Sequence, residues 1–580
     1  MSESLSPSST SRPTPYSRWL LFLGAREDQV FLVLTLLIGA LVGLIVVVLI
    51  LVSERFGQRL YPPGSEAWRR FLIPTLGSLL TGYLLYRYFP EARGSGVPQT
   101  KAALYAREGR ITLPTVFGRF LCTTISLGCG IPLGREGPSV QIGGGIASFL
   151  GRKLGLRPEK VKSLIPVGAA AAIAAAFNTP LAAVLFTLEE VVGDLHAPVL
   201  GSVVLASATS WGVLRLLLGN EPLFQVPQYQ LVNPWELVIY GVLGVAGGVI
   251  SAAFTQLLLK SRAWFLGLPR RTVWFQPVAG GLLVGLMGWF LPEVLGVGYK
   301  YVGDALNGSL TLKLMVLLLV MKLIASAISY GSGNAGGIFG PSLFLGAMLG
   351  GALGGAARHF FPGATAEPGA YALVGMGTAF AGVIRAPMTS VVMIFEITRD
   401  YSVIVPLMIS NLVSYFIASR IQPKPVYEVI AGQDGIHLPS HPRIDGIQRQ
   451  VARIIKPATD VLRADEPLES ALERIRPIAQ RTWPVCDTLG GAIGILTLEQ
   501  LDSAVAGARS GVVSDLVPAG EFPHVHTDHS LEIALERMGA ARLDTLPVVS
   551  RANIHELLGI VKLNDILEFY GLKDSIQRTN

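Results

Sequence analysis

The chain has 580 residues, of which 15% are charged and 51% are hydrophobic, and its mean hydropathy is +0.50. Soluble globular chains carry about 25% charged residues, so this composition excludes a purely soluble protein. The first 420 residues carry 31 basic and 19 acidic side chains, whereas the last 160 carry 16 and 21. We interpret the first part as a membrane domain and the rest as a soluble appendage. The lipid bilayer accounts for the basic balance, and no nucleic acid is expected as a partner.

The first 27 residues are read as a cytoplasmic N-terminal segment. The chain starts with a polar stretch rich in serine and proline, without the basic and then apolar pattern of a signal peptide. Arg12, Arg18 and Arg26 precede the first apolar stretch. The positive-inside rule therefore predicts a cytoplasmic N-terminus, and the soluble appendage should lie on the same side.

Uncharged stretches of very different length follow. A perpendicular span needs about 20 apolar residues, and four stretches meet that length: 30–52, 163–188, 237–259 and 401–419. The stretch 323–357 is uncharged but rich in glycine, and 71–86 and 314–321 are short. Long and short segments interrupted by Gly and Pro are typical of the broken helices of transporters. The alternative is that glycine only allows close helix packing.

An internal repeat relates the two halves of the membrane part. Residues 168–190 align without a gap on residues 375–397, at a constant offset of 207. Upstream, residues 134–140 align on residues 337–343 at an offset of 203. The alternative is chance matching of helices rich in Gly and Ala. Two matches in the same order favour a duplicated architecture, and in transporters such halves are commonly inverted.

Three loops place glycine next to proline: GSGVP at 94–98, GREGP at 134–138 and GGIFGP at 336–341. Proline suits the first turn of a helix, so each loop predicts a helix start inside the membrane. A helix start carries unpaired N–H groups and the positive end of the helix dipole. Because these groups need a partner in a membrane, the three loops together predict an anion-binding site.

Glu136 lies inside the second loop. A carboxylate is costly to bury there unless it is protonated or accepts hydrogen bonds. At an anion site it can occupy the place of the anion and leave when protonated. The neighbouring Arg135 is expected to pair with an acid or a helix end. Glu189 and Glu190 end a long uncharged run, and the simplest interpretation makes them an interfacial pair at the membrane boundary.

These motifs, in this order and with FNTPLAAVLFTLEE (177–190) between the last two, resemble the CLC family of chloride channels and chloride/proton exchangers. The resemblance runs from about Asp28 to Tyr427. It implies an all-α polytopic membrane fold built from inverted repeats of many tilted, partly spanning helices. It also implies a homodimer with a separate anion path in each subunit, in the plasma membrane or a bacterial inner membrane.

The resemblance also implies roles for individual residues. Ser95 and Tyr427 match the hydroxyl donors to the central anion, and Ile338 and Phe339 match the backbone amide donors. Glu136 matches the external gating glutamate. Ser95, where other members have proline, favours chloride over nitrate, and the retained motifs argue against the fluoride-exporting branch.

Glu190 matches the internal proton acceptor of the family's exchangers, where many channels carry an apolar residue. Its presence favours chloride/proton antiport, with Glu136 as gate and Glu190 as internal acceptor. The alternative within the family is a passive voltage- or pH-gated chloride channel. A divalent cation transporter would need clustered intramembrane acids, and an intramembrane enzyme would need a nucleophile–base pattern. The membrane part offers neither, so no enzyme activity is expected.

The soluble appendage contains a second repeat. Leu468–Ile475 (LESALERI) returns as Leu531–Met538 (LEIALERM), and two pairs of strand-like segments follow at similar spacing. The order helix, strand, strand, helix, occurring twice, resembles a tandem pair of CBS domains, an α/β regulatory module. The expected boundaries are 1–27 for the N-terminal segment, 28–430 for the membrane domain, 431–450 for the linker, 451–510 for CBS domain 1 and 511–575 for CBS domain 2.

Such CBS pairs often hold adenine nucleotides, through a Thr or Ser with an Asp three residues on. The first copy has Thr497 but Gln500, and the second has Asp565 but Lys562. A nucleotide contact through Thr497 or Asp565 stays open beside a purely structural module. Chloride is the substrate ion, and no cofactor is required.

No metal site is expected. His524, His526 and His529 occur within six residues, but they fall on an expected strand, where alternating side chains point to opposite faces. The three cysteines of the chain form no Cys-x-x-Cys pair, so they suggest neither a zinc nor a redox site.

Overall fold

The computed structural model describes residues 27–570, with the exception of 63, 196, 220–222, 225, 228, 230–231, 364, 400, 437, 439–449, 479, 508–510, 519, 521 and 552. The predicted cytoplasmic segment and most of the predicted linker lie outside the described residues. The internal contacts divide the chain into two compact units at residue 439, one helical and one mixed α/β.

The helical unit repeats one series of helices. Its first half contains α2 (Glu27–Leu60), α3 (Ala67–Arg87), α4 (Val97–Tyr105), α5 (Leu113–Gly128), α6 (Glu136–Lys153), α7 (Pro158–Phe177), α8 (Pro180–Phe186), the π-helical turn η2 (Thr187–Val192) and α9 (Leu200–Leu218). The second half contains α10 (Glu236–Leu266), α11 (Gln276–Phe290), α12 (Tyr299–Leu306), α13 (Leu312–Gly331), α14 (Phe339–Phe360), α15 (Pro368–Ile384), α16 (Pro387–Thr398) and α17 (Ile404–Ile421). The helix α18 (Val426–Gln433) follows, and short 3-10 turns lie at 90–92, 270–272 and 292–294.

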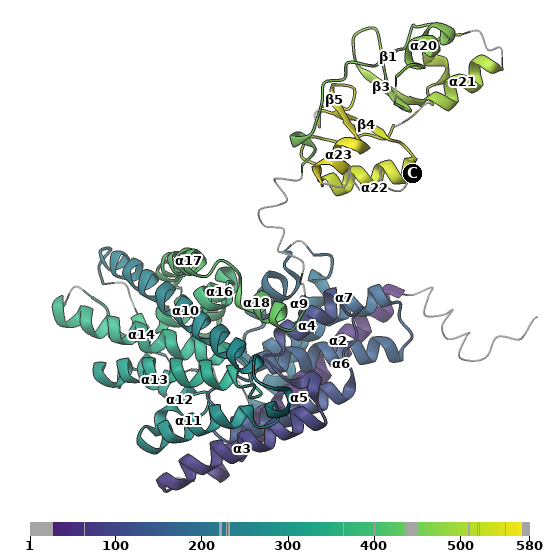
Figure 1. Ribbon diagram of the computed structural model, residues 1–580. Coiled ribbons are helices and arrows are strands. Elements are labelled where there is room, and N and C mark those ends of the chain that lie inside the picture. Colours follow the sequence, from purple (N-terminus) through teal and green to yellow (C-terminus); the bar gives the residue numbers. More distant parts are fainter. Residues whose placement is uncertain are drawn as a thin grey trace, which may run out of the picture. The chain divides into compact units, whose positions relative to one another are not determined.

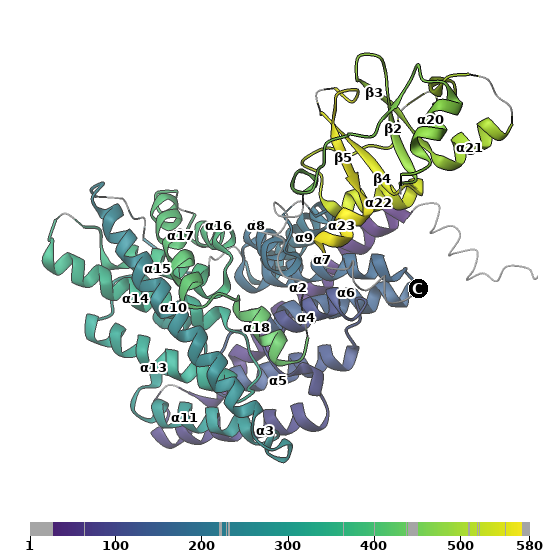
Figure 2. The same ribbon diagram turned by 45° about the horizontal axis from the view of Figure 1, so that its top comes forward.

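The predicted duplication therefore extends over the whole membrane part. Each helix from α2 to α9 has a counterpart in α10 to α17, with α6 and α7 packed together in one half and α14 and α15 in the other. In Figures 1 and 2 the helices α2, α6 and α7 lie on one side of the unit, and α13 and α14 lie on the other. The helices α3 and α11 pack side by side across the two halves.

Two glutamates connect the halves in a reciprocal way. Glu189 accepts hydrogen bonds from the backbone N–H of Thr389 (2.9 Å) and from its hydroxyl (2.8 Å), at the start of α16. Its repeat counterpart Glu396 accepts from the N–H groups of Leu181 (2.9 Å) and Ala182 (2.7 Å), at the start of α8. Each half thus supplies the carboxylate that caps a helix of the other half.

In the described part of the chain, seven helical stretches are long and apolar enough to cross a membrane. Two expectations for single segments were wrong. The stretch 163–188 is not one helix, because α7 ends at Phe177, Asn178 adopts the left-handed conformation (φ 60°), and Pro180 starts α8. The stretch 314–321 was expected to be too short to span, but it belongs to α13, which is 20 residues long because the helix continues beyond Lys322 to Gly331, and which is one of the seven.

The α/β unit contains the two copies predicted from sequence. The first has β1 (Leu462–Arg463), α20 (Leu468–Ile475), β2 (Thr482–Cys486), β3 (Ala492–Thr497) and α21 (Leu498–Ala506). The second has α22 (Leu531–Ala541), β4 (Thr545–Val549), β5 (Leu557–Lys562) and α23 (Leu563–Phe569), and 3-10 turns lie at 451–453 and 513–516. In both copies the central strands pair antiparallel, β2 with β3 and β4 with β5, and β1 joins β2 in parallel. One apolar cluster contains residues of both copies, from Ala492 to Ile566.

Candidate functional site

Two of the predicted loops are joined directly to each other. The backbone N–H of Gly134 donates to the carbonyl of Gly337 at 2.7 Å, and the N–H of Gly337 donates to the carbonyl of Gly134 at 2.7 Å. This antiparallel bridge brings the start of α6 against the start of α14, two helices at equivalent places in the repeat. The pairing satisfies loop backbone groups that would otherwise lack partners inside a membrane.

Four helices begin around this bridge. The helices α4, α6 and α14 each carry proline in their first turn, at Pro98, Pro138 and Pro341, as the sequence predicted. The helix α4 packs against α6 and against α18, and α6 packs against α14. Each helix start contributes unpaired N–H groups and a positive partial charge. Their convergence therefore favours an electropositive region at these helix starts.

The structure brings the predicted hydroxyl donors together. Ser95 lies in the loop before α4, and Tyr427 lies in the first turn of α18; both side chains are fully buried. The two hydroxyl groups lie close to each other, and within the described residues neither makes a hydrogen bond of regular geometry. A buried hydroxyl without a partner is costly, so two of them side by side indicate a ligand position.

Ile338 and Phe339 lie at the start of α14, where backbone N–H groups have no carbonyl partner within the helix. Both residues are fully buried. The ring of Phe339 packs against Phe186 (centroids 4.8 Å apart) and lies 6.5 Å from the ring of Tyr427. The aromatic packing fixes the orientation of this helix start beside the Tyr427 hydroxyl.

Glu136 is fully buried at the first position of α6. One carboxylate oxygen accepts a hydrogen bond from the hydroxyl of Tyr299, a residue of α12. The other oxygen lies beside Gly134 and the N–H of Gly340 in the first turn of α14. The carboxylate is thus seated at a helix start, where a small anion would be bound. Arg135 pairs instead with Glu54, at 2.9 Å, as expected for it.

The two acids of the FTLEE run have different surroundings. Both are buried in the protein, and each is held by a partner on another helix. Glu189 caps α16, as described above, whereas Glu190 forms a buried ion pair with Lys101 of α4. Sequence reasoning missed Lys101 and Tyr299. A lone lysine in a short intramembrane helix is a signal that could have identified the first, because such charges are rare without a partner.

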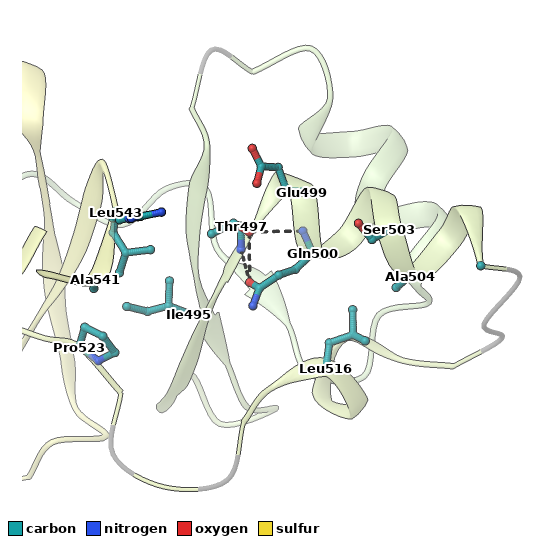
Figure 3. A pocket seen from close by; sticks show the side chains of 12 residues that line it. Ile495, Thr497, Glu499, Gln500, Ser503, Ala504, Leu516, Pro523, Ala541 and Leu543 are labelled. Carbon is teal, nitrogen blue, oxygen red and sulfur yellow. Dashed lines mark hydrogen bonds between the residues drawn. The ribbon is translucent and has the colours of Figure 1, made fainter. Parts of the chain in front are cut away.

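The α/β unit contains an open cavity of about 960 Å³, lined by residues of both copies that include Thr497 and Arg542 (Figure 3). The hydroxyl of Thr497 accepts a hydrogen bond from the N–H of Gln500 at 3.3 Å, and the side-chain oxygen of Gln500 accepts one from the N–H of Thr497 at 2.9 Å. Asp565 does not line this cavity and pairs with Lys456 at 2.7 Å. The structure therefore does not bring the two candidate nucleotide contacts together.

The histidines of the α/β unit make local contacts. His524 and His526 place ring nitrogens 2.8 Å and 2.9 Å from the carbonyls of Phe522 and Val549. Among the described residues, no group of three or more His, Cys, Asp or Glu side chains is placed to hold a metal ion.

The features of the helical unit are those of an anion transport protein. The starts of four helices lie near one another, together with two buried hydroxyl groups and one carboxylate at a helix start. Residues 77–419 match the family model described as voltage gated chloride channel. Because this match covers more than half of the chain, the chain belongs to that family, the CLC family that the motifs resemble. Residues 513–571 match the CBS domain model.

Curated relatives include an H(+)/Cl(-) exchange transporter ClcA of Vibrio campbellii, 34% identical over 60% of this chain and 75% of the relative. A putative chloride channel protein ClcB-like of Ralstonia nicotianae is 34% identical over 62% of this chain and 85% of the relative. These names place the chain among transport proteins rather than enzymes, as predicted.

Solved structures show the same fold. A slow cyanobacterial Cl⁻/H⁺ antiporter matches with a TM-score of 0.65 and 27% identity, over 70% of this chain and 97% of that one. A eukaryotic CLC transporter matches with a TM-score of 0.60 and 22% identity, over 92% of this chain and 97% of that one. The predicted fold class is confirmed for both units.

Proposed function

We propose that this protein exchanges chloride for protons across a membrane. The observation that carries the proposal is the position of the Glu136 carboxylate, which lies at the start of α6 against the start of α14. A carboxylate in an anion position competes with chloride, and protonation removes its charge and releases the position. One residue can thereby couple the movement of the two ions.

The anion path is proposed to pass the hydroxyls of Ser95 and Tyr427 and the N–H groups of Ile338 and Phe339. Hydroxyl and amide donors bind a small anion without the full charge of a lysine or arginine, so the anion can also leave. Chloride as the transported ion agrees with the names of the relatives.

Glu190 is proposed as the internal proton acceptor. It is buried beside the second turn of α4, the helix that follows the loop carrying Ser95, where an ionisable group is costly and is retained for function. This acid, and the antiporters among the relatives, favour exchange over the alternative of a passive voltage- or pH-gated channel.

The test is simultaneous chloride and proton flux from liposomes that contain the wild-type protein, Glu136→Gln or Glu190→Gln. In Glu136→Gln we expect chloride flux to persist without proton coupling, because the amide neither carries a proton nor competes as an anion. In Glu190→Gln we expect chloride flux to persist and proton flux to vanish, because a proton relay needs each titratable group.

Glu159→Gln is a matched control, since Glu159 is exposed in the first turn of α7 and its substitution should leave coupling intact. Undiminished proton transport in Glu190→Gln would contradict the relay. Absence of coupled proton flux in the wild-type protein would favour the channel.

The assembly and topology follow as further parts of the proposal. We infer a homodimer with one anion path per subunit, in a plasma or inner membrane, with both termini in the cytoplasm. The basic residues before the first span support this orientation. Chemical cross-linking in vesicles measures the dimer, and protease access to the tail in sealed vesicles measures the side.

The domain boundaries are proposed at 28–430 for transport, 431–450 for the linker, and 451–510 and 511–575 for the CBS copies. The tail is a regulatory module on this proposal. An adenine nucleotide would reach it through the cavity beside Thr497, since Arg542 there offers a cation for a phosphate group. Equilibrium dialysis of ATP, ADP and AMP against the protein tests this, with Arg542→Gln expected to weaken binding.

A further inference from the structure

The loop that carries Ser95 has an unassigned counterpart in the second half. Gly94, Ser95 and Gly96 precede α4, and Gly296, Val297 and Gly298 precede α12, which is the repeat equivalent of α4. All four glycines have positive φ, at 97° and 101° in the first loop and at 64° and 87° in the second. Glycine adopts positive φ without strain, so both loops can enter their helix through such residues, although ψ of the last glycine differs, at −40° for Gly96 and 20° for Gly298.

A buried cation holds each loop. Arg119 of α5 donates to the carbonyl of Gly94 at 2.5 Å. Lys322 occupies the equivalent place in α13 and donates to the carbonyls of Gly296 at 2.6 Å and Val294 at 2.9 Å. Both side chains are fully buried. The two halves thus use the same device, a cation on a neighbouring helix that fixes a Gly-x-Gly turn.

The two loops present different groups. The first presents the hydroxyl of Ser95, and the second leads into Tyr299, whose hydroxyl donates to the carboxylate of Glu136. The Tyr299 ring is held from two sides. The guanidinium of Arg135 lies 5.4 Å from its centroid, and the ring of Phe224 meets it edge-on with centroids 5.7 Å apart.

We propose that Tyr299 is a positioning residue that retains Glu136 in the anion position, and that the loop held by Lys322 fixes Tyr299 for this purpose. The inference rests on the proposed role of Glu136 as the gate. A hydroxyl that donates to a carboxylate stabilises the seated, charged form. Chloride must displace a carboxylate that is hydrogen-bonded to a fixed tyrosine, which slows each cycle and weakens apparent chloride binding.

The test compares Tyr299→Phe with the wild-type protein in liposomes, measuring chloride turnover and the chloride concentration at half-maximal rate. Phenylalanine keeps the ring between Arg135 and Phe224 and removes only the hydroxyl. We expect turnover to rise about tenfold, the worth of one hydrogen bond to a charged group, and the half-maximal chloride concentration to fall. The chloride-to-proton ratio should stay unchanged, because Glu136 still carries the proton.

The same substitution in the Glu136→Gln background distinguishes two effects of removing the Tyr299 hydroxyl. One is the loss of its hydrogen bond to the Glu136 carboxylate, and the other is a general weakening of the local packing. Without the charged carboxylate, Tyr299→Phe should change turnover less than twofold, because effects on a shared contact are not additive. Tyr301→Phe, two residues further along α12 and half-buried, is the matched control and should behave as the wild type.

Unchanged or slower turnover in Tyr299→Phe would overturn the inference, as would an equal increase in the Glu136→Gln background. If Glu136→Gln alone keeps proton coupling, the proposed gate fails instead. The two failures are therefore distinguishable.

Discussion

The ammonium group of Lys101 lies 2.8 Å from a carboxylate oxygen of Glu190, and the side chains are only 5% and 4% exposed. Lys101 belongs to α4, the helix whose preceding loop carries Ser95. One nine-residue helix therefore connects the anion position at its start with the proposed proton acceptor beside its second turn. The groups that we propose to bind chloride and to accept protons are thus linked through one helix.

Lys101→Met should destabilise the protein by about 3–5 kcal/mol, because it leaves a buried carboxylate without its cation. Lys101→Met combined with Glu190→Gln should cost much less, since no unpaired charge remains. Thermal unfolding in detergent measures both. Glu190→Gln alone completes the double-mutant cycle. Equal losses in the single and the double variant would show that the ion pair does not stabilise the fold.

Ser95→Pro should shift selectivity from chloride towards nitrate, and Ser95→Ala should shift it in the same direction by about tenfold or less. Both remove a hydroxyl donor, and a small anion depends more on point hydrogen bonds than a larger, softer one. Competing chloride and nitrate uptake into liposomes measures the ratio. Ser148→Ala is the control, because that buried hydroxyl donates to the carbonyl of Gly109. Unchanged ratios would remove Ser95 from the site.

Gly137→Ala should weaken chloride binding about tenfold while the protein stays folded. A Cβ at this position would lie 2.5 Å from the carbonyl oxygen of Ser95 and 2.8 Å from its hydroxyl oxygen, so the loop must shift. Gly212→Ala is the matched control, since nothing lies within 4 Å of its added carbon. Titration calorimetry with chloride measures both. Wild-type affinity in Gly137→Ala would mean that the loop tolerates displacement.

The α/β unit should lose stability as the pH falls below about 6.5. Burial, reinforced by the positive charge of Arg537, lowers the pKa of His529 below its ordinary value. Between that lowered pKa and about 6.5 the unfolded chain binds more protons than the folded chain, so protonation favours unfolding there. The Tm of the unit, followed from pH 8 to pH 5.5, should fall, and His529→Asn should reduce the slope. An identical slope in the variant would contradict the assignment.

Much of the site could be predicted from the sequence because the helix starts that form it are marked by short local motifs. Proline next to glycine marks a helix start wherever it occurs, so the starts of α6 and α14 could be predicted without knowing what they meet. The repeat offset then implied that these two starts are equivalent. Buried Glu136 could be predicted for the same reason, since a carboxylate among helix-start amides has one chemical use.

The contacts of these residues could not be predicted. Tyr299 is 163 residues from Glu136 and lies in a short helix outside the aligned motifs. Its loop resembles that of Ser95 only in its two glycines, and the conformation of those glycines appears only in three dimensions. Burial of Glu190 was also hidden, because an acid at the end of an apolar run is equally compatible with a membrane surface.

The reciprocal caps of Glu189 and Glu396 also constrain how the protein can move. Transporters built from two halves commonly open by rocking one half against the other. Here such a rotation would pull each carboxylate from the helix it caps and leave N–H groups unpaired at the starts of α8 and α16. The bridge between Gly134 and Gly337 would break in the same motion. If Glu136 is the gate that we propose, we expect the two halves to stay in place while side chains move, so that the width of one glutamate separates the two faces of the membrane.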